Sequence, residues 1–93
     1  MVIGVCTVDL YLPTTHSLKD KRRIIKSAVE RIRSRFNVSV AEVEHQDRWG
    51  QAQIAMAAVS NETAHVQQVL NAAVKVFDNY SEAEVTQVSF EMR

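Results

Sequence analysis

The residues of this chain that could do chemistry gather around one short segment, in which His45, Asp47 and Trp49 alternate. If a strand continues through them, they share one face and offer an imidazole and a carboxylate for proton transfer or for a metal ion. His16 is a further candidate, but these groups are too few for a zinc centre. An aspartate in a turn and a tryptophan over a sheet edge explain the segment equally well. We therefore expect no catalytic residue, no bound metal and no cofactor.

A second concentration of reactive side chains lies between positions 19 and 35, which hold eight of the eleven basic residues and two acidic ones. This segment carries a net charge of +6. The remainder, with three basic and nine acidic residues, carries −6, so the total of zero hides a separation of charge. On a helical wheel, the cations that share an arc opposite the apolar stripe are Lys19, Arg22, Arg23, Lys26 and Arg33.

This basic arc could follow a phosphate backbone, and we assign its five residues to a candidate nucleic-acid-binding surface. Ser17, at the start of the predicted helix, could hold a phosphate through free backbone amides. The alternative is a solvated helix face whose charges keep the protein in solution.

Lys21 falls inside the apolar stripe instead of on the basic arc. A lysine in that position either extends past the first turn to reach water or pairs with a carboxylate of the neighbouring strand region, Glu42, Glu44 or Asp47. We favour such a structural pair over contact with a ligand.

Two helices are predicted to carry these side chains. Ser17 is a good N-cap and Asp20 suits the positive end of a helix, which predicts a helix over residues 18–36. Residues 60–63 supply cap chemistry for a second helix over residues 62–79, whose apolar stripe runs from Val66 to Tyr80.

Four strands complete the pattern. Residues 2–12 and 51–59 are apolar at both parities, as in strands covered on both faces. Residues 38–45 form a third strand, in which the apolar residues change parity between Val40 and Ala41, and this suggests either a bulge or a position covered on both sides. Residues 83–92 alternate, which predicts a half-buried strand with Thr86, Val88, Phe90 and Met92 on the inward side and Gln87, Ser89 and Glu91 on the other.

The resulting order, β-α-β-β-α-β, predicts an α+β fold: a ferredoxin-like sandwich in which a four-stranded antiparallel sheet carries two helices on one face. A length of 93 residues predicts a single domain over residues 1–93. The chain is 46% hydrophobic and has only two glycines and one proline, so disorder, collagen-like repeats and loop-dominated folds fit it poorly. A lone cysteine, Cys6, with no long apolar run or export signal predicts a cytoplasmic, non-membrane protein in which Cys6 is an inert core thiol.

Two layers leave the other face of the sheet open, although the strands carry apolar residues on both faces. We expect a homodimer or a higher homo-oligomer to cover this face, with Ile54 or Met56 sensitive to substitution. The alternative is that its small side chains tolerate water. The sheet has no aromatic platform of the RNA-recognition-motif type, so RNA would be contacted through the helix, the loops and charge.

Several segments together resemble the YlxP-like family, which is domain of unknown function number 503. The resemblance is carried by Ser-Leu-Lys-x-Lys-Arg-Arg at residues 17–23, by Ala-Glu-Val-x-His-Gln-Asp at residues 41–47 and by Trp49. The signature positions are Ser17, Leu18, Lys19, Lys21, Arg22, Arg23, Glu42, His45, Asp47 and Trp49. The resemblance implies a ferredoxin-like fold but no established reaction. Genes of the family often lie among those for transcription elongation, translation initiation and ribosome maturation, which implies a connection with RNA or the ribosome.

The leading hypothesis is therefore a cytoplasmic, non-enzymatic accessory protein that binds RNA or a ribosomal partner through the basic arc. An oligomeric protein interaction module without nucleic-acid binding is the second hypothesis. A small-ligand or metal site near Lys21, His45 and Asp47 is the third.

Overall fold

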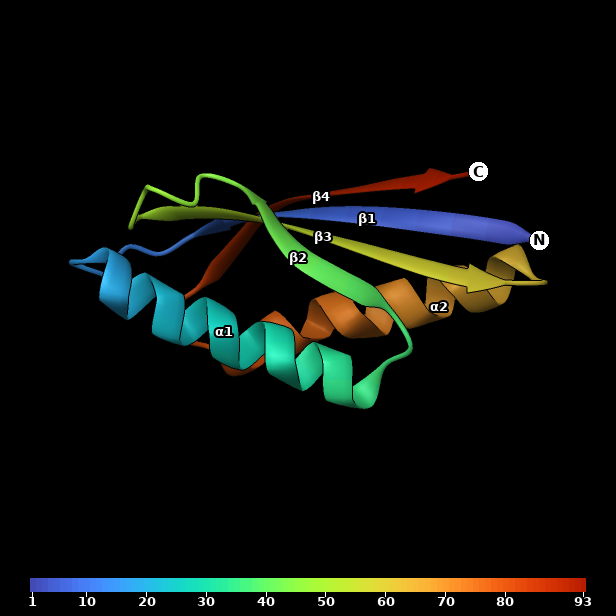
Figure 1. Cartoon of the computed structure of the whole chain (residues 1–93), viewed down its shortest axis with the longest axis horizontal. Helices are drawn as coiled ribbons and strands as arrows, with labels where there is room; N and C mark the ends of the chain where they lie inside the picture. Colours follow the sequence, from blue (N-terminus) through green and yellow to red (C-terminus); the bar gives the residue numbers. More distant parts are fainter.

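The computed structural model describes residues 1–93, and its elements follow the predicted order. They are β1 (Val2–Tyr11), α1 (Leu18–Arg35), β2 (Ser39–Glu44), β3 (Gln51–Ser60), α2 (Thr63–Val74), the 3-10 helix η1 (Lys75–Asn79) and β4 (Glu84–Met92). The strands form one sheet in the order β2-β3-β1-β4, and all neighbouring pairs are antiparallel. Both helices lie on one face of this sheet (Figure 1). The predicted α+β, ferredoxin-like fold is confirmed.

The core fills the space between the sheet and the two helices. On β1, Cys6, Val8 and Leu10 point into it, and on β3 the inward residues include Ile54 and Met56. The inward face of α1 contributes Ile24, Ile25, Ala28, Val29 and Ile32, and that of α2 contributes Val66, Leu70 and Ala73. Ile32 and Leu70 are fully buried, as expected for apolar stripes on amphipathic helices.

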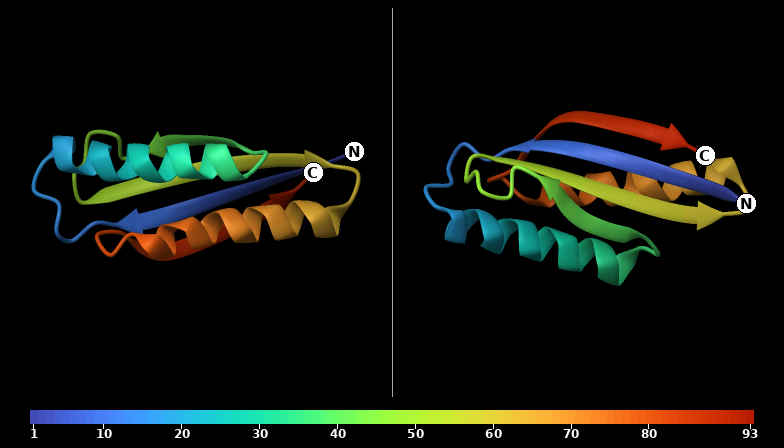
Figure 2. Two further views of the ribbon diagram at one scale, coloured as in Figure 1. Left: turned by 90° about the horizontal axis from the view of Figure 1, so that it is seen from below. Right: turned by 45° about the horizontal axis from the view of Figure 1, so that its top comes forward.

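The opposite face of the sheet has no layer over it, as the right-hand view shows, in which the top of the molecule comes forward (Figure 2). Because side chains alternate along a strand, this open face carries Ile3 and Val5 from β1 and Ala55 and Ala57 from β3. The expectation that Ile54 or Met56 belongs to it was wrong, since both side chains are buried beneath the helices. Side chains point alternately to the two faces of a strand. When both of these sets are apolar, the sequence does not reveal which set faces the helices.

Two irregularities in strand pairing also depart from the sequence prediction. In β2 the register shifts between Glu42 and Glu44, so the predicted bulge exists but lies later than expected. The pairing of β4 with β1 shifts register between Asp9 and Leu10, because Asp9 pairs with Gln87 and Leu10 with Val85. As a result Val85 takes the inward position and Thr86 is exposed. The predicted inward position of Thr86 was therefore wrong, and its hydroxyl Oγ1 instead donates to the Asp9 carbonyl at 3.2 Å.

The second helix is less regular than its sequence suggested. Its α-helical part ends at Val74, and the chain continues as a 3-10 turn to Asn79. Glu62 is the N-cap but its side chain makes no capping hydrogen bond, whereas Ser60 Oγ accepts from the Glu62 amide at 3.3 Å. The predicted cap segment therefore orders the backbone just before the helix. It does not supply a side-chain acceptor for the backbone amides of the first helical turn. No helix of the structure is long and apolar enough to span a membrane.

The loop between β1 and α1 and the turn between β2 and β3 meet at the end of the molecule away from the termini (Figure 1). The Leu12 amide donates to the Gly50 carbonyl at 2.9 Å. The buried Thr15 hydroxyl is placed to donate to the carbonyls of Leu12, at 3.0 Å, and of Trp49. These contacts fix the start of α1 against the β2–β3 turn.

Candidate functional site

Lys21 joins α1 to the β2–β3 region through a buried charge. Only 1% of its side chain is exposed, and Nζ lies 2.8 Å from Glu42 Oε2. Nζ also donates to the His45 carbonyl oxygen. Since Glu42 Oε2 is buried and has no well-aligned hydrogen-bond donor, the nearby ammonium charge is what stabilises it. The expected pairing of Lys21 with a carboxylate is confirmed, with Glu42 as the partner.

His45, Asp47 and Trp49 do not share a strand face. The strand ends at Glu44, and His45 has a φ of 65°, in the left-handed region that turns the chain away from β2. The His45 carbonyl accepts from the Arg48 amide at 3.0 Å as well as from Lys21, which offsets the cost of this conformation. The alternation in the sequence therefore belongs to a turn, and no acid-base pair of His45 and Asp47 is built by it.

Trp49 lies instead against His16. Their ring centres are 6.3 Å apart and the planes are tilted by 44°. Trp49 is 48% exposed and His16 is exposed, so the pair forms an aromatic surface just before the N-terminus of α1. There Ser17 caps the helix, its Oγ accepting from the Asp20 amide at 3.1 Å. No group of three or more His, Cys, Asp or Glu side chains is arranged to hold a metal ion.

The basic arc of α1 faces solvent over the length of the helix. All five of its members, Lys19, Arg22, Arg23, Lys26 and Arg33, are exposed. Arg33 donates from Nη2 to the Val40 carbonyl at 2.9 Å, which turns it toward β2. Arg23 Nη2 lies 3.8 Å from Glu82 Oε2, a weak contact between exposed groups. The other three make no hydrogen bond or ion pair with the protein, so their charges are free to meet an anion.

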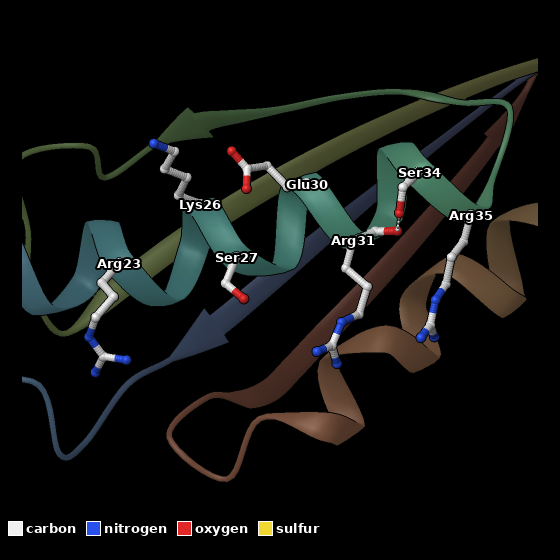
Figure 3. A pocket seen from close by; sticks show the side chains of 7 residues that line it. All are labelled: Arg23, Lys26, Ser27, Glu30, Arg31, Ser34 and Arg35. Atoms are coloured by element: carbon white, nitrogen blue, oxygen red, sulfur yellow. Dashed lines mark hydrogen bonds between the residues drawn. The ribbon is translucent and has the colours of Figure 1, made fainter.

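Further basic side chains continue the arc on the side of α1 nearer to α2, as Figure 3 shows. A shallow hollow of about 630 Å³ lies along the helix, lined by seven polar or charged side chains, four of them basic. The Arg31 guanidinium carbon lies 5.3 Å from the centre of the Tyr80 ring, and the Tyr80 hydroxyl is 2.7 Å from Ser27 Oγ. Arg31 is thus held in place over Tyr80, while Arg35 beside it is exposed.

Arg31, Arg35 and Tyr80 contribute to this surface, although the sequence pattern did not predict it. A spacing of four residues along Arg23, Ser27, Arg31 and Arg35 marks one ridge of a helix and could have identified the two arginines. Tyr80 was assigned to the apolar stripe of the second helix, whereas it follows η1 and turns its hydroxyl toward α1. No sequence signal locates that contact.

Cys6 takes no part in this surface. It is fully buried in the core, and burial raises the pKa of its thiol from 9.0 to about 11. The thiolate, which is the nucleophilic form, is therefore disfavoured at neutral pH. The prediction that Cys6 lies in the core is confirmed.

The chain resembles known proteins over nearly its whole length. It matches the family described as "Protein of unknown function (DUF503)" over residues 3–90. It is 31% identical over 85 residues to the "Uncharacterized protein YlxP" of Bacillus subtilis (strain 168), covering 91% of this chain and 92% of the relative.

Two solved structures are similar in fold. The de novo designed protein Foldit4 superposes with a TM-score of 0.55 at 13% identity, over 100% of this chain and 97% of the design. The de novo designed protein LFR1 1 with ferredoxin fold gives a TM-score of 0.52 at 7% identity, over 100% of this chain and 83% of the design. These likenesses establish the fold alone. On the strength of the match over residues 3–90 and of the identity to YlxP, the chain belongs to the DUF503 family.

Proposed function

We propose that this protein is a non-enzymatic, cytoplasmic accessory protein that binds RNA, free or within a ribosomal particle, through the basic arc of α1. Lys19, Arg22, Arg23 and Lys26 would contact phosphate, and Arg33 would contribute from the side of β2. The single observation that supports this most is that all five cations of the basic arc are exposed to solvent, and that Lys19, Arg22 and Lys26 make no hydrogen bond or ion pair within the protein.

Charge separation strengthens the proposal. Phosphate binding gains free energy because each cation releases counterions from the nucleic acid, and this gain requires cations that are not already neutralised. The one carboxylate within the arc is Glu30, and the buried pair of Lys21 with Glu42 lies beneath the surface. Lys21 is accordingly a positioning residue in this proposal, and it holds the β2–β3 turn beside the first turns of α1.

The test is binding of the purified protein to total ribosomal RNA and to ribosomal subunits across a salt series. Wild type is expected to bind at low salt and to weaken steeply as salt rises, and Arg22→Glu/Arg23→Glu is expected to bind roughly tenfold or more weakly. A matched control, Lys75→Glu/Arg93→Glu, makes the same change in net charge at two exposed residues outside α1 and should bind nearly as wild type. Equal losses in both variants, or no binding by wild type at low salt, would refute the proposal.

A second candidate function is supported by the open sheet face. Val59 is 61% exposed there, and a shallow apolar depression of about 240 Å³ is lined mainly by Val5, Ala41, Ala55 and Ala57. The small alanine side chains would let an identical face approach closely. We propose that a second copy of this chain covers the open face in a homodimer, which is compatible with RNA binding and would also serve a purely protein-binding module.

Sedimentation at micromolar concentration tests the dimer. Ala55→Glu places a charge in the centre of the open face and is expected to yield a monomer. Gln67→Glu on the exposed side of α2 should leave the dimer intact. A wild-type protein that sediments as a monomer would disprove this proposal.

A further inference from the structure

Trp49 is a large aromatic side chain that this fold leaves half uncovered. It is 48% exposed and does not belong to the hydrophobic core or to the side chains packed against it. A tryptophan at such a position contributes little to folding, and exposing its ring to water is unfavourable. A partner that stacks on the ring would remove this cost.

The backbone around Trp49 is held more firmly than the exposure of its ring suggests. The Trp49 carbonyl accepts from the buried Thr15 hydroxyl, and the next carbonyl, that of Gly50, accepts from the Leu12 amide. Lys21 holds the other end of the same turn at the His45 carbonyl. His16 lies against the indole from the side of the β1–α1 loop. The aromatic ring is therefore presented in a prearranged position, which lowers the entropy that a ligand must overcome.

The basic arc begins beside this aromatic surface. His16 immediately precedes the N-cap Ser17, and Lys19 and Arg22 follow within the first turns of α1. Arg33 contacts the Val40 carbonyl, so the side of α1 that carries Arg22, Lys26 and Arg33 is the side toward β2 and its turn. A chain of phosphates along this side would bring a neighbouring nucleotide to Trp49.

We infer that Trp49, supported by His16, stacks an unpaired nucleobase, so that the RNA taken by the basic arc is single-stranded where it reaches the N-terminal end of α1. This inference rests on the proposed function. Exposed aromatic rings accept any base because each base has a π-face, whereas a base inside a duplex is already stacked on its neighbours. The combination of cations and one aromatic platform fits a single strand better than a blunt duplex.

The experiment uses the fact that Trp49 is the only tryptophan of the chain, so intrinsic tryptophan fluorescence reports on this residue alone. A mixed-sequence 12-nucleotide RNA is titrated into the wild-type protein as a single strand and as a blunt duplex. Stacking predicts saturable quenching by the single strand and little by the duplex. In anisotropy with a labelled single strand, Trp49→Ala is expected to bind about tenfold or more weakly. Trp49→Phe, which keeps an aromatic face, should retain most of the affinity.

Phe90→Ala is the matched control, because it removes another exposed aromatic ring, on β4 opposite Cys6 and away from the β2–β3 turn. It should bind as wild type, and a thermal melt should show that Trp49→Ala remains folded. RNA binding that depends on Arg22 and Arg23 but is unchanged in Trp49→Ala and causes no quenching would overturn this inference and leave the proposed function standing. No binding of any RNA at low salt would overturn both.

Discussion

Lys21 is the residue on which the geometry of the candidate site depends most directly. Its ammonium group is the cation for Glu42 and a donor to the His45 carbonyl, and it is 1% exposed. Lys21→Met keeps the length of the side chain but leaves a buried carboxylate oxygen without its cation. We expect the free energy of unfolding to fall by about 3 kcal/mol, measured by urea denaturation.

Lys19→Met is the control for this substitution, because Lys19 lies on the exposed side of the same first turn. Its effect on stability should stay within about 0.5 kcal/mol. If Lys21→Met were as stable as wild type and had nevertheless lost RNA binding, Lys21 would be a ligand contact and the structural interpretation of the pair would be wrong.

The buried thiol of Cys6 gives a second prediction for a single residue. Its pKa is 9.0 in an unperturbed thiol and about 11 in the folded protein. Below pH 9 both states keep the proton. Between pH 9 and 11 only the unfolded state ionises, so stability should fall with rising pH by up to about 3 kcal/mol. The pH dependence of unfolding in Cys6→Ala, subtracted from that of wild type, isolates this contribution, and a flat difference would contradict the account.

At the scale of elements, the packing of α2 on β1 depends on Gly4. A Cβ atom at this position would lie 2.2 Å from Val66 Cγ1 and 3.0 Å from Leu70 Cδ1. Gly4→Ala should therefore push α2 from the sheet and lower stability by about 1–3 kcal/mol in thermal or chemical denaturation. Gly50→Ala is the matched control, since nothing lies within 4 Å of its added methyl group and its φ is not positive. Equal stability of the two variants would show that the close approach at Gly4 is tolerated.

The elements were predictable from sequence where a single pattern determines them. Local sequence patterns were enough to predict the apolar stripe of α1, its Ser17 cap and the β-α-β-β-α-β order of the elements. These features in turn predict the antiparallel sheet and the basic arc. Strand details were not predictable, because β1 and β3 are apolar at both parities and the bulge opposite Asp9 arises from pairing between distant segments.

In the candidate site too, features that depend on nearby residues were predictable, and contacts between segments far apart in the sequence were not. The partner of Lys21 could be narrowed to three carboxylates because a buried lysine requires one. The sequence does not predict the turn at His45 or the contact of His16 with Trp49. Both depend on hydrogen bonds of Thr15 and Lys21 that join segments far apart in the sequence.

At the scale of the whole molecule, the two proposed surfaces lie on opposite sides. The basic arc is on the outer side of a helix that covers one face of the sheet, and the proposed dimer surface is the other face (Figure 2). Occupation of one surface therefore does not block the other. Arg22→Glu/Arg23→Glu should leave the sedimentation coefficient unchanged while it weakens RNA binding, and a change of oligomeric state in this variant would show that α1 takes part in the interface.

The central claim is that cations of α1 contact RNA phosphates, and the slope of log affinity against log salt concentration tests it most directly. Each phosphate contact contributes about −0.7 to this slope for a single strand. Arg22→Gln/Lys26→Gln removes two cations of the basic arc, so its slope should be less steep than that of wild type by about 1.4. An unchanged slope in this double variant, with binding retained, would contradict the claim that the basic arc is the RNA-binding surface.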